Sequence, residues 1–239
     1  LNKLLFHDLG AMTCAVQPGI TLEALNRQLA PEGVWFPVDI ASGSRATIGG
    51  MTATGASGPR ALRYGGMREN VSAIDAILAD ASEAVFGELP EDFPDPDGPG
   101  AFDDGLLTLL EMGEQHEEMI RRVFPDLPQR AAGYNLDALL PDRQPHNMAE
   151  LLVGSEGTLA LSKRIELKLA PLPKNRVLGV CHFPDLRAAL EAVPYLVKQQ
   201  PTAIELMDQR LLDFAASNAR LAPILRRFIR GEPGAVLLI

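Results

Sequence analysis

The spacing of apolar and polar residues predicts a chain of alternating short strands and helices. Short apolar or β-branched runs bounded by turn residues are typical of strands, and apolar residues at i, i+3 and i+4 are typical of amphipathic helices. Strand patterns cover 11–17, 70–79, 83–86, 176–183, 203–206 and 235–239, and 151–161 reads as two strands around a tight turn. Helical patterns cover 21–29, 106–124, 186–199 and 209–228, and the last of these would hold one or two helices. The mixture predicts an α+β fold.

Turn and capping residues fix several boundaries of these elements. The pair Pro18-Gly19 ends the first strand, and Thr21 opens the helix that follows. Asp80-Ala81-Ser82 is the expected hairpin turn between strands 70–79 and 83–86. Glu205 and Asp208 precede the helix at 209–228, and we interpret both as capping residues in preference to catalytic ones.

The segment 88–105 interrupts this pattern. It holds four prolines, three glycines and seven acidic residues, so we expect an acidic surface loop in an insertion of about 88–130. In the helix after it, Gly113 is a predicted weak point, and His116 lies among three glutamates. An exposed acidic helix face is a more common explanation of that cluster than a metal site.

Charge and cysteine usage exclude several classes of function. The chain of 239 residues has 22 Lys and Arg against 31 Asp and Glu, a net charge of −9 that argues against a nucleic-acid surface. Cys14 and Cys181 lack metal-ligand spacing and are expected to be buried thiols. The chain begins at Leu1 without methionine and ends in a strand pattern, so we expect a fragment of a longer protein.

The most informative stretch is 36–66, in which seven of thirty-one residues are glycine. Glycine allows a backbone to turn at positive φ and lets another group approach closely. Gly49, Gly50 and Gly58, with threonine and serine hydroxyls between them, would offer bare N–H groups to an anionic or planar ligand. A run of turns between strands is the alternative.

The wording of this stretch resembles the flavin-contacting block of the FAD-linked oxidases of the vanillyl-alcohol oxidase type, which have a PCMH-type FAD-binding domain. That block reads P-x-D-x-x-S-x-x-x-x-T-I-G-G-M-x-A-T-N-A-S-G, followed by Y-G. The matching residues are Pro37, Asp39, Ser42, Thr47, Ile48, Gly49, Gly50, Met51, Ala53, Thr54, Ala56, Ser57, Gly58, Tyr64 and Gly65. Gly55 departs from it, because the family often has Asn there.

A second signature, Gly154-Ser155-Glu156-Gly157-Thr158, resembles the family's GSEGTL segment, although an ordinary hairpin would also explain it. The resemblance implies that both segments approach FAD. It implies this set of cofactor-binding residues: Pro37, Ser42, Thr47, Ile48, Gly49, Gly50, Thr54, Ser57, Gly58, Gly154, Glu156, Gly157 and Thr158.

The resemblance also implies the domain organisation. Residues 1–174 would form the second half of the PCMH-type FAD-binding domain, a mostly antiparallel sheet flanked by helices. Residues 175–239 would begin a ferredoxin-like α/β cap domain, the family's C-terminal domain. The family's pyrophosphate loop and its histidine-rich metal and base site would lie outside this chain, so the sequence assigns no catalytic residue and no metal ligand.

The activity implied is oxidation of a small 2-hydroxy acid, as in the D-lactate, glycolate and D-2-hydroxyglutarate dehydrogenases. Electrons would pass to a separate acceptor, a protein or a quinone. The sequence of residues 131–160 is most similar to the corresponding segment of the long family members, which carry a fused iron–sulfur domain. We expect a cytoplasmic protein, at the inner membrane at most peripherally, able to form homo-oligomers. The alternatives are an enolpyruvyl-glucosamine reductase-like flavoenzyme and a non-catalytic structural fragment.

Overall fold

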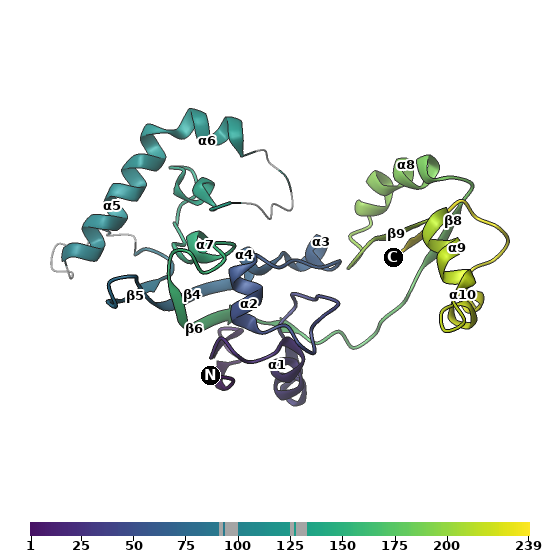
Figure 1. Cartoon of the computed structure of the whole chain (residues 1–239), viewed down its shortest axis with the longest axis horizontal. Helices are drawn as coiled ribbons and strands as arrows, with labels where there is room; N and C mark the ends of the chain where they lie inside the picture. The colour runs from purple at the N-terminus through teal and green to yellow at the C-terminus, as the bar shows by residue number, and fades with distance from the viewer. Residues whose placement is uncertain (91–92, 94–99, 125–126, 128–132) are drawn as a thin grey trace. The chain divides into compact units, whose positions relative to one another are not determined.

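The computed structural model describes residues 1–90, 93, 100–124, 127 and 133–239 (Figure 1). Within it the chain forms two compact units. Unit 1 comprises residues 1–58 and 65–172, and unit 2 comprises residues 59–64 and 173–239.

A five-stranded sheet forms the centre of unit 1, and all of its neighbouring strands are antiparallel. Its order is β1 (Leu4–Asp8), β2 (Thr13–Val16), β6 (Leu161–Lys168), β4 (Val71–Ile77) and β5 (Glu83–Phe86). The hairpin predicted at 80–82 is confirmed, because Ile77 lies opposite Glu83. A separate pair joins β3 (Val34–Trp35) to β7 (Ala170–Pro171).

Short helices surround this sheet. They are α1 (Leu22–Leu29), η1 (Ala30–Glu32), α2 (Ile48–Ala53), α4 (Met67–Asn70), α5 (Gly100–Gln115), α6 (Glu117–Val123), η2 (Leu136–Leu139) and α7 (Ala149–Leu152). Helix α1 begins as predicted, since Thr21 Oγ1 accepts a hydrogen bond of 3.3 Å from the Ala24 N–H. Fully buried Phe36, Ile48 and Ile165 belong to one core that joins the glycine-rich stretch to the sheet.

Unit 2 is built on a smaller antiparallel sheet. Its elements are α3 (Ala61–Tyr64), β8 (Val180–Phe183), α8 (Leu186–Val197), β9 (Glu205–Asp208), α9 (Gln209–Ser217), α10 (Ala222–Phe228) and β10 (Ala235–Leu238). The strand order is β8-β10-β9, and α8 packs on it through Ala189. Asp208 caps α9 as expected, accepting 2.9 Å from the Leu211 N–H. The capping role expected for Glu205 is wrong, because this residue lies within β9.

The α+β class with antiparallel sheets is confirmed, and Cys14 is buried as expected, but Cys181 is only partly buried and two element boundaries differ from the prediction. Residues 151–153 do not form a strand, since α7 runs to Leu152. The helix expected at 106 begins at Gly100 and is divided at His116 into α5 and α6. At Gly113 the absence of a side chain lets the Leu139 backbone pack closely against α5. Predictions for 91–92, 94–99 and 131–132 lie outside the described residues.

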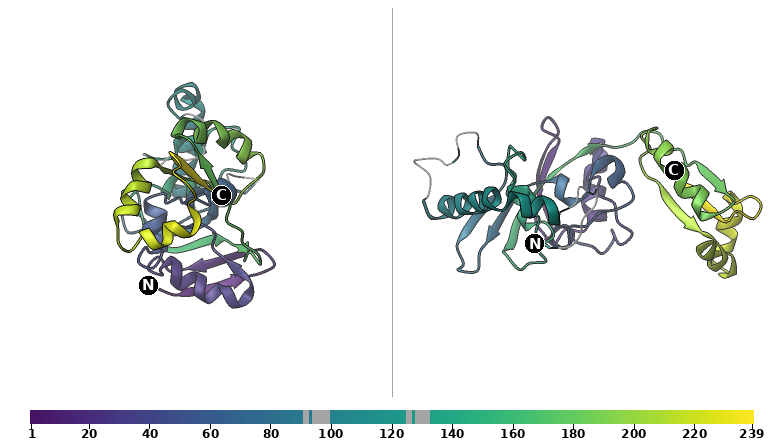
Figure 2. Two further views of the ribbon diagram at one scale, coloured as in Figure 1. Left: turned by 90° about the vertical axis from the view of Figure 1, so that its right-hand side faces the viewer. Right: turned by 90° about the horizontal axis from the view of Figure 1, so that it is seen from above.

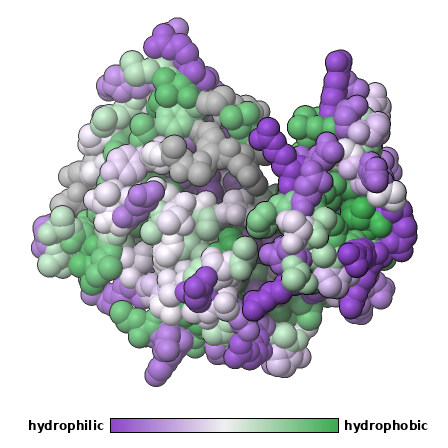
Figure 3. Space-filling view, turned by 45° about the vertical axis from the view of Figure 1, so that its right-hand side comes forward, coloured by the Kyte–Doolittle hydropathy of each residue, from purple (hydrophilic) through white to green (hydrophobic). Residues whose placement is uncertain are grey.

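Figure 2 shows the ribbon from two further directions, and Figure 3 shows hydrophilic and hydrophobic residues interspersed over one face of the molecule (Figures 2 and 3). Among the described residues, none of the helices has the length and apolar character needed to cross a bilayer. The same residues include no cluster of three or more His, Cys, Asp or Glu able to hold a metal ion.

Candidate functional site

The structure brings the two glycine-containing signatures into direct contact. The Gly154 N–H donates a hydrogen bond of 2.9 Å to the Thr52 carbonyl, and the Glu156 N–H donates one of 2.8 Å to the Ala53 carbonyl. Both acceptors lie at the end of α2, where the last carbonyls of a helix have no partner within the helix. The turn at 154–157 therefore satisfies the C-terminal end of α2. In Figure 1, α2 and α7 accordingly lie near each other in unit 1.

This junction depends on left-handed backbone conformations on both sides. Gly55 has a φ of 60°, and a Cβ built on it would lie 3.4 Å from the Gly154 Cα. Gly154 and Gly157 have φ values of 83° and 75°, and Glu156 has a φ of 52°. Positive φ is strained for a residue with a side chain. The strain at Glu156 is thus offset by the contacts that hold the turn.

Hydroxyl groups extend the junction at Thr158. Its Oγ1 donates to the Ser155 carbonyl at 2.6 Å, and the Tyr134 hydroxyl lies 2.9 Å from the same Oγ1. Thr158 and Glu156 are both exposed. The turn therefore presents a hydroxyl pair and a carboxylate to solvent at the edge of the junction.

The expectation of bare N–H groups at the start of α2 is wrong. The N–H groups of Ile48 and Gly49 donate to the carbonyls of Ile20 and Pro18, at 2.8 and 2.7 Å, and the Gly50 N–H donates to Thr47 Oγ1 at 3.1 Å. A Cβ on Gly49 would lie 2.6 Å from the Pro18 Cβ. The first glycine of this pair is explained by close packing on the Pro18-Gly19 turn, and these donors are occupied within the protein.

The remaining predicted residues have diverse surroundings. Ser57 Oγ is buried and has no hydrogen-bond partner among the described residues, while Gly58 packs against the Asp39 carbonyl oxygen. The Thr54 hydroxyl donates to the Gly50 carbonyl at 3.0 Å. Pro37 is buried, and Ser42 is exposed in a turn where its carbonyl accepts from the Arg45 and Ala46 N–H groups.

Sequence reasoning missed a cluster of polar residues that holds the second signature in place. Arg68 Nε donates to Glu150 Oε2 at 2.6 Å, and Arg68 Nη1 donates to Asp137 Oδ2 at 2.9 Å. Asn135 Nδ2 donates to the carbonyls of Glu150 and Val153, both at 2.9 Å. Nothing in the sequence pattern links these positions, because they are distant along the chain and their types are common on surfaces.

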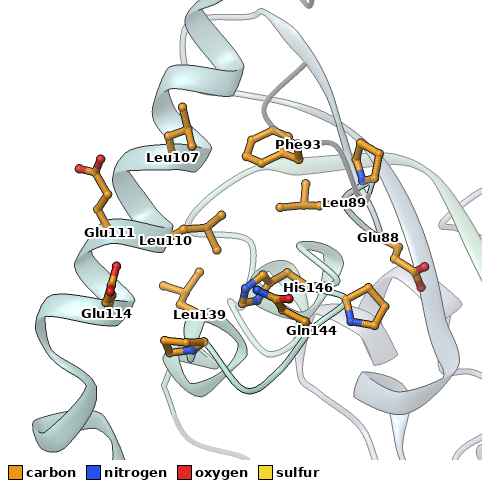
Figure 4. Close-up of a pocket in the computed structure, with 13 residues that line it drawn as sticks. Glu88, Leu89, Phe93, Leu107, Leu110, Glu111, Glu114, Leu139, Gln144 and His146 are labelled. Atoms are coloured by element: carbon orange, nitrogen blue, oxygen red, sulfur yellow. The ribbon is translucent and has the colours of Figure 1, made fainter. Parts of the chain in front are cut away.

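A cavity of about 1000 Å³ lies elsewhere in unit 1, between α5 and the segment that ends at His146 (Figure 4). Leucine, phenylalanine and proline side chains line it, together with Glu88, Glu111 and Glu114. His146 Nδ1 lies 3.0 Å from the Ala138 carbonyl oxygen. The three carboxylates in the lining oppose the binding of an anion, so this cavity suits neither a pyrophosphate nor a carboxylate substrate.

Comparison with protein families gives two matches. Residues 1–86 match the family described as FAD binding domain, and residues 172–239 match the family described as FAD linked oxidases, C-terminal domain. These matches lie in units 1 and 2, respectively, apart from the short segment 59–64 and residue 172.

Curated relatives are much longer than this chain. D-2-hydroxyglutarate dehydrogenase of Pantoea ananatis is 30% identical over 221 residues, which are 90% of this chain and 21% of that protein. A probable mitochondrial D-lactate dehydrogenase of Danio rerio is 33% identical over 200 residues, 83% of this chain and 31% of that protein. The chain thus spans about a fifth to a third of the length of these relatives.

A solved structure of alkyldihydroxyacetonephosphate synthase has the same fold. It aligns with a TM-score of 0.61 over 99% of this chain and 36% of its own, at 20% sequence identity. At that identity the likeness concerns the fold alone.

Proposed function

We propose that the chain is part of a flavoprotein that oxidises a small 2-hydroxy acid, because residues 1–86 match the FAD binding domain family and residues 172–239 match the C-terminal domain family of FAD linked oxidases. The relatives named D-2-hydroxyglutarate and D-lactate dehydrogenases support this substrate class. In this proposal electrons pass to a separate acceptor, a protein or a quinone. The protein is cytoplasmic and at most peripheral at the inner membrane. In this proposal residues 1–174 contribute to the FAD domain and 175–239 to the cap domain.

The observation that carries the proposal is the junction of α2 with the turn at 154–157. Two segments that resemble flavin-contacting blocks are far apart in the sequence, yet two backbone hydrogen bonds join them. Beside this junction, Gly157 leaves open space in which a planar ring or an adenine can lie without meeting a side chain.

The residues present fit FAD by their chemistry. Ser57 Oγ is a buried hydroxyl without a partner among the described residues, and a buried polar group in this state needs a hydrogen bond from a ligand or water. A Cβ on Gly157 would meet nothing within 4 Å, so the turn has space beside it. The Ser57 hydroxyl can donate to or accept from the polar edges of a flavin or ribose, and the hydroxyl oxygens of Thr54, Thr158 and Tyr134 can accept from them.

When bound, FAD supplies the two-electron oxidation of the hydroxyl-bearing carbon. The residues of this chain orient the cofactor and exclude water from one of its faces. Glu156 and Thr158, which are exposed beside the junction, would contact its polar edges. The base that removes the substrate proton is not assigned to any residue of this chain.

The test uses the complete reading frame that contains residues 1–239, purified and supplied with FAD. We expect a yellow protein whose flavin absorbance is bleached under anaerobic conditions by D-lactate or D-2-hydroxyglutarate and not by their L isomers. NADPH is the control reductant. Faster bleaching by NADPH would favour the reductase-like alternative, and a colourless protein that retains no FAD would contradict the proposal.

A further inference from the structure

A partly buried ionic cluster lies beside the proposed flavin site without belonging to the predicted set. Arg68, on α4, bonds Glu150 of α7 and Asp137 of η2 at 2.6 and 2.9 Å. The side chains of Arg68, Asp137 and Glu150 are 17%, 5% and 25% exposed. Arg143 Nη2 lies 3.3 Å from Asp137 Oδ2, so two cations face two carboxylates.

This arrangement keeps the Arg68 guanidinium charged and fixed in direction. Burial, the largest single contribution, lowers the pKa of Arg68, but the carboxylates of Glu150 and Asp137 together raise it above the ordinary value. A guanidinium forms a planar fork with donors in fixed directions, which a lysine cannot reproduce. Arg68 therefore determines the distance between α4 and the two carboxylates it bonds.

Both ends of this cluster are connected to the junction. On one side, Met67, the neighbour of Arg68, donates its N–H to the Ala56 carbonyl at 2.9 Å, within the glycine-rich stretch. On the other side, Glu150 lies in α7, which leads through Val153 into the turn at Gly154. The ionic cluster thus joins α4 to α7 and η2, while the junction joins the end of α2 to the turn that follows α7.

We propose that Arg68 is a positioning residue that sets how the turn at 154–157 docks on the end of α2, and thereby sets the affinity for FAD. The inference rests on the proposed function for the identity of the ligand. Arg68 acts through Glu150 and α7, and it does not need to touch the cofactor.

The test compares Arg68→Lys with Arg121→Lys in the complete protein. Arg121 is a matched control, because it also bonds two carboxylates, Glu117 and Asp142, but is 45% exposed on α6. We expect Arg68→Lys to raise the FAD dissociation constant by roughly 10- to 100-fold, by analogy with the affinity lost when residues that orient metal ligands are replaced. Arg121→Lys should leave it unchanged. Flavin fluorescence titration measures both.

Hydrogen exchange of the cofactor-free protein separates positioning from general stability. Arg68→Lys should speed exchange of the Gly154 and Glu156 amides, which bond the end of α2, and leave the Ile165 amide in β6 protected. A purely stabilising role would speed exchange at all three amides together. Glu150→Gln keeps the side-chain volume and one acceptor oxygen, so we expect it to lower the FAD affinity and speed exchange at Gly154 and Glu156 by smaller amounts. This variant replaces Arg68→Lys in the test if Arg68→Lys does not fold.

The outcomes are distinct. The positioning role is overturned if the wild-type protein binds FAD and both Arg68→Lys and Glu150→Gln bind it with the same affinity. The amides of Gly154 and Glu156 would then also exchange hydrogen at the wild-type rate in these two variants. If the wild-type protein binds no FAD, the proposed function fails instead, and the exchange at these two amides decides whether Arg68 positions the turn.

Discussion

The backbone N–H of Gly154 lies 2.9 Å from the carbonyl oxygen of Thr52, and this hydrogen bond joins the second signature to the end of the first. Thr52 is itself buried, and its hydroxyl donates to the Ile48 carbonyl at 2.8 Å, so the acceptor is held within α2. The turn at 154–157 thus docks on a fixed helix end. The predictions below test the backbone requirements of this contact and its surroundings.

Gly154→Ala should weaken FAD binding at a modest cost in stability. A Cβ at this position would meet only the Gly133 carbonyl oxygen, at 3.9 Å, so the cost comes from the φ of 83° and should be about 1–2 kcal/mol. Gly231→Ala is the control, because Gly231 has a φ of 66° and open space around it. Urea unfolding should give similar losses for both variants. If Gly154→Ala and Gly231→Ala lowered the FAD affinity equally, the assignment of the turn at 154–157 to the FAD site would be contradicted.

Gly55 should accept asparagine and reject valine. Asparagine tolerates the left-handed region that the φ of 60° requires, whereas a β-branched residue does not. We expect Gly55→Asn to change the free energy of unfolding by less than about 1 kcal/mol and Gly55→Val to lower it by at least about 2 kcal/mol. Chemical denaturation measures both. Equal losses would show that crowding against Gly154, and not φ, restricts the position.

Gly49 and Gly50 should respond differently to alanine although they are neighbours. At Gly49 the added Cβ would overlap the Pro18 Cβ and lie 3.0 Å from the Pro18 carbonyl oxygen, so we expect a loss of about 1–3 kcal/mol from overpacking. At Gly50 it would contact only Thr47 Oγ1, at 3.1 Å, and the better helix propensity of alanine offsets part of that crowding, leaving a change below about 1 kcal/mol. Thermal unfolding measures both losses. If Gly50→Ala lowered the stability more than Gly49→Ala, the packing of α2 on the Pro18-Gly19 turn would be contradicted.

The Cys14 thiol should make stability depend on alkaline pH. Burial, aided by the charge of Glu166, raises the pKa of Cys14 from 9.0 to about 12. The unfolded chain therefore loses this proton at a lower pH than the folded chain does. The contribution to stability is complete below pH 9 and is lost as the pH rises toward 12, by at most about 1.4 kcal/mol per pH unit.

The matched variant for that measurement is Cys14→Ala, which removes the thiol and leaves every other titrating group in place. The difference between the two unfolding free energies should be constant from pH 7 to 8 and then change in favour of the variant between pH 9 and 10.5. A difference that stays constant over this range would mean that the thiol ionises equally in both states.

The sequence predicted the elements whose signals are local. Thr21 and Asp208 cap helices where expected, and the hairpin at 80–82 pairs the expected strands, because capping and turn preferences depend on neighbouring residues. The prediction of a strand at 151–153 was wrong because the conformation of this segment depends on contacts that are distant in the sequence. An apolar run of this length does not distinguish a strand from a buried helical turn, and the Asn135 amide bonds to Glu150 and Val153 favour the helix.

The candidate site was predictable only in part. The two segments, 36–66 and 154–158, could be found from their sequence motifs. Their contact arises from tertiary packing at the end of α2, which no local pattern encodes. The occupied N–H groups of Gly49 and Gly50 depend on the Pro18 backbone and on Thr47. Arg68 and Asp137 could not be paired in advance, because a buried ion pair is specified by the fold and not by spacing.

The central claim is that FAD lies against residues 47–58 and 154–158 together. Hydrogen–deuterium exchange of the complete protein with and without saturating FAD tests it most directly. The account predicts that FAD slows exchange in both segments at once, with no comparable change around the cavity lined by Glu111 and Glu114. Protection confined to that cavity, or to one segment while the other exchanges as freely as before, would contradict it.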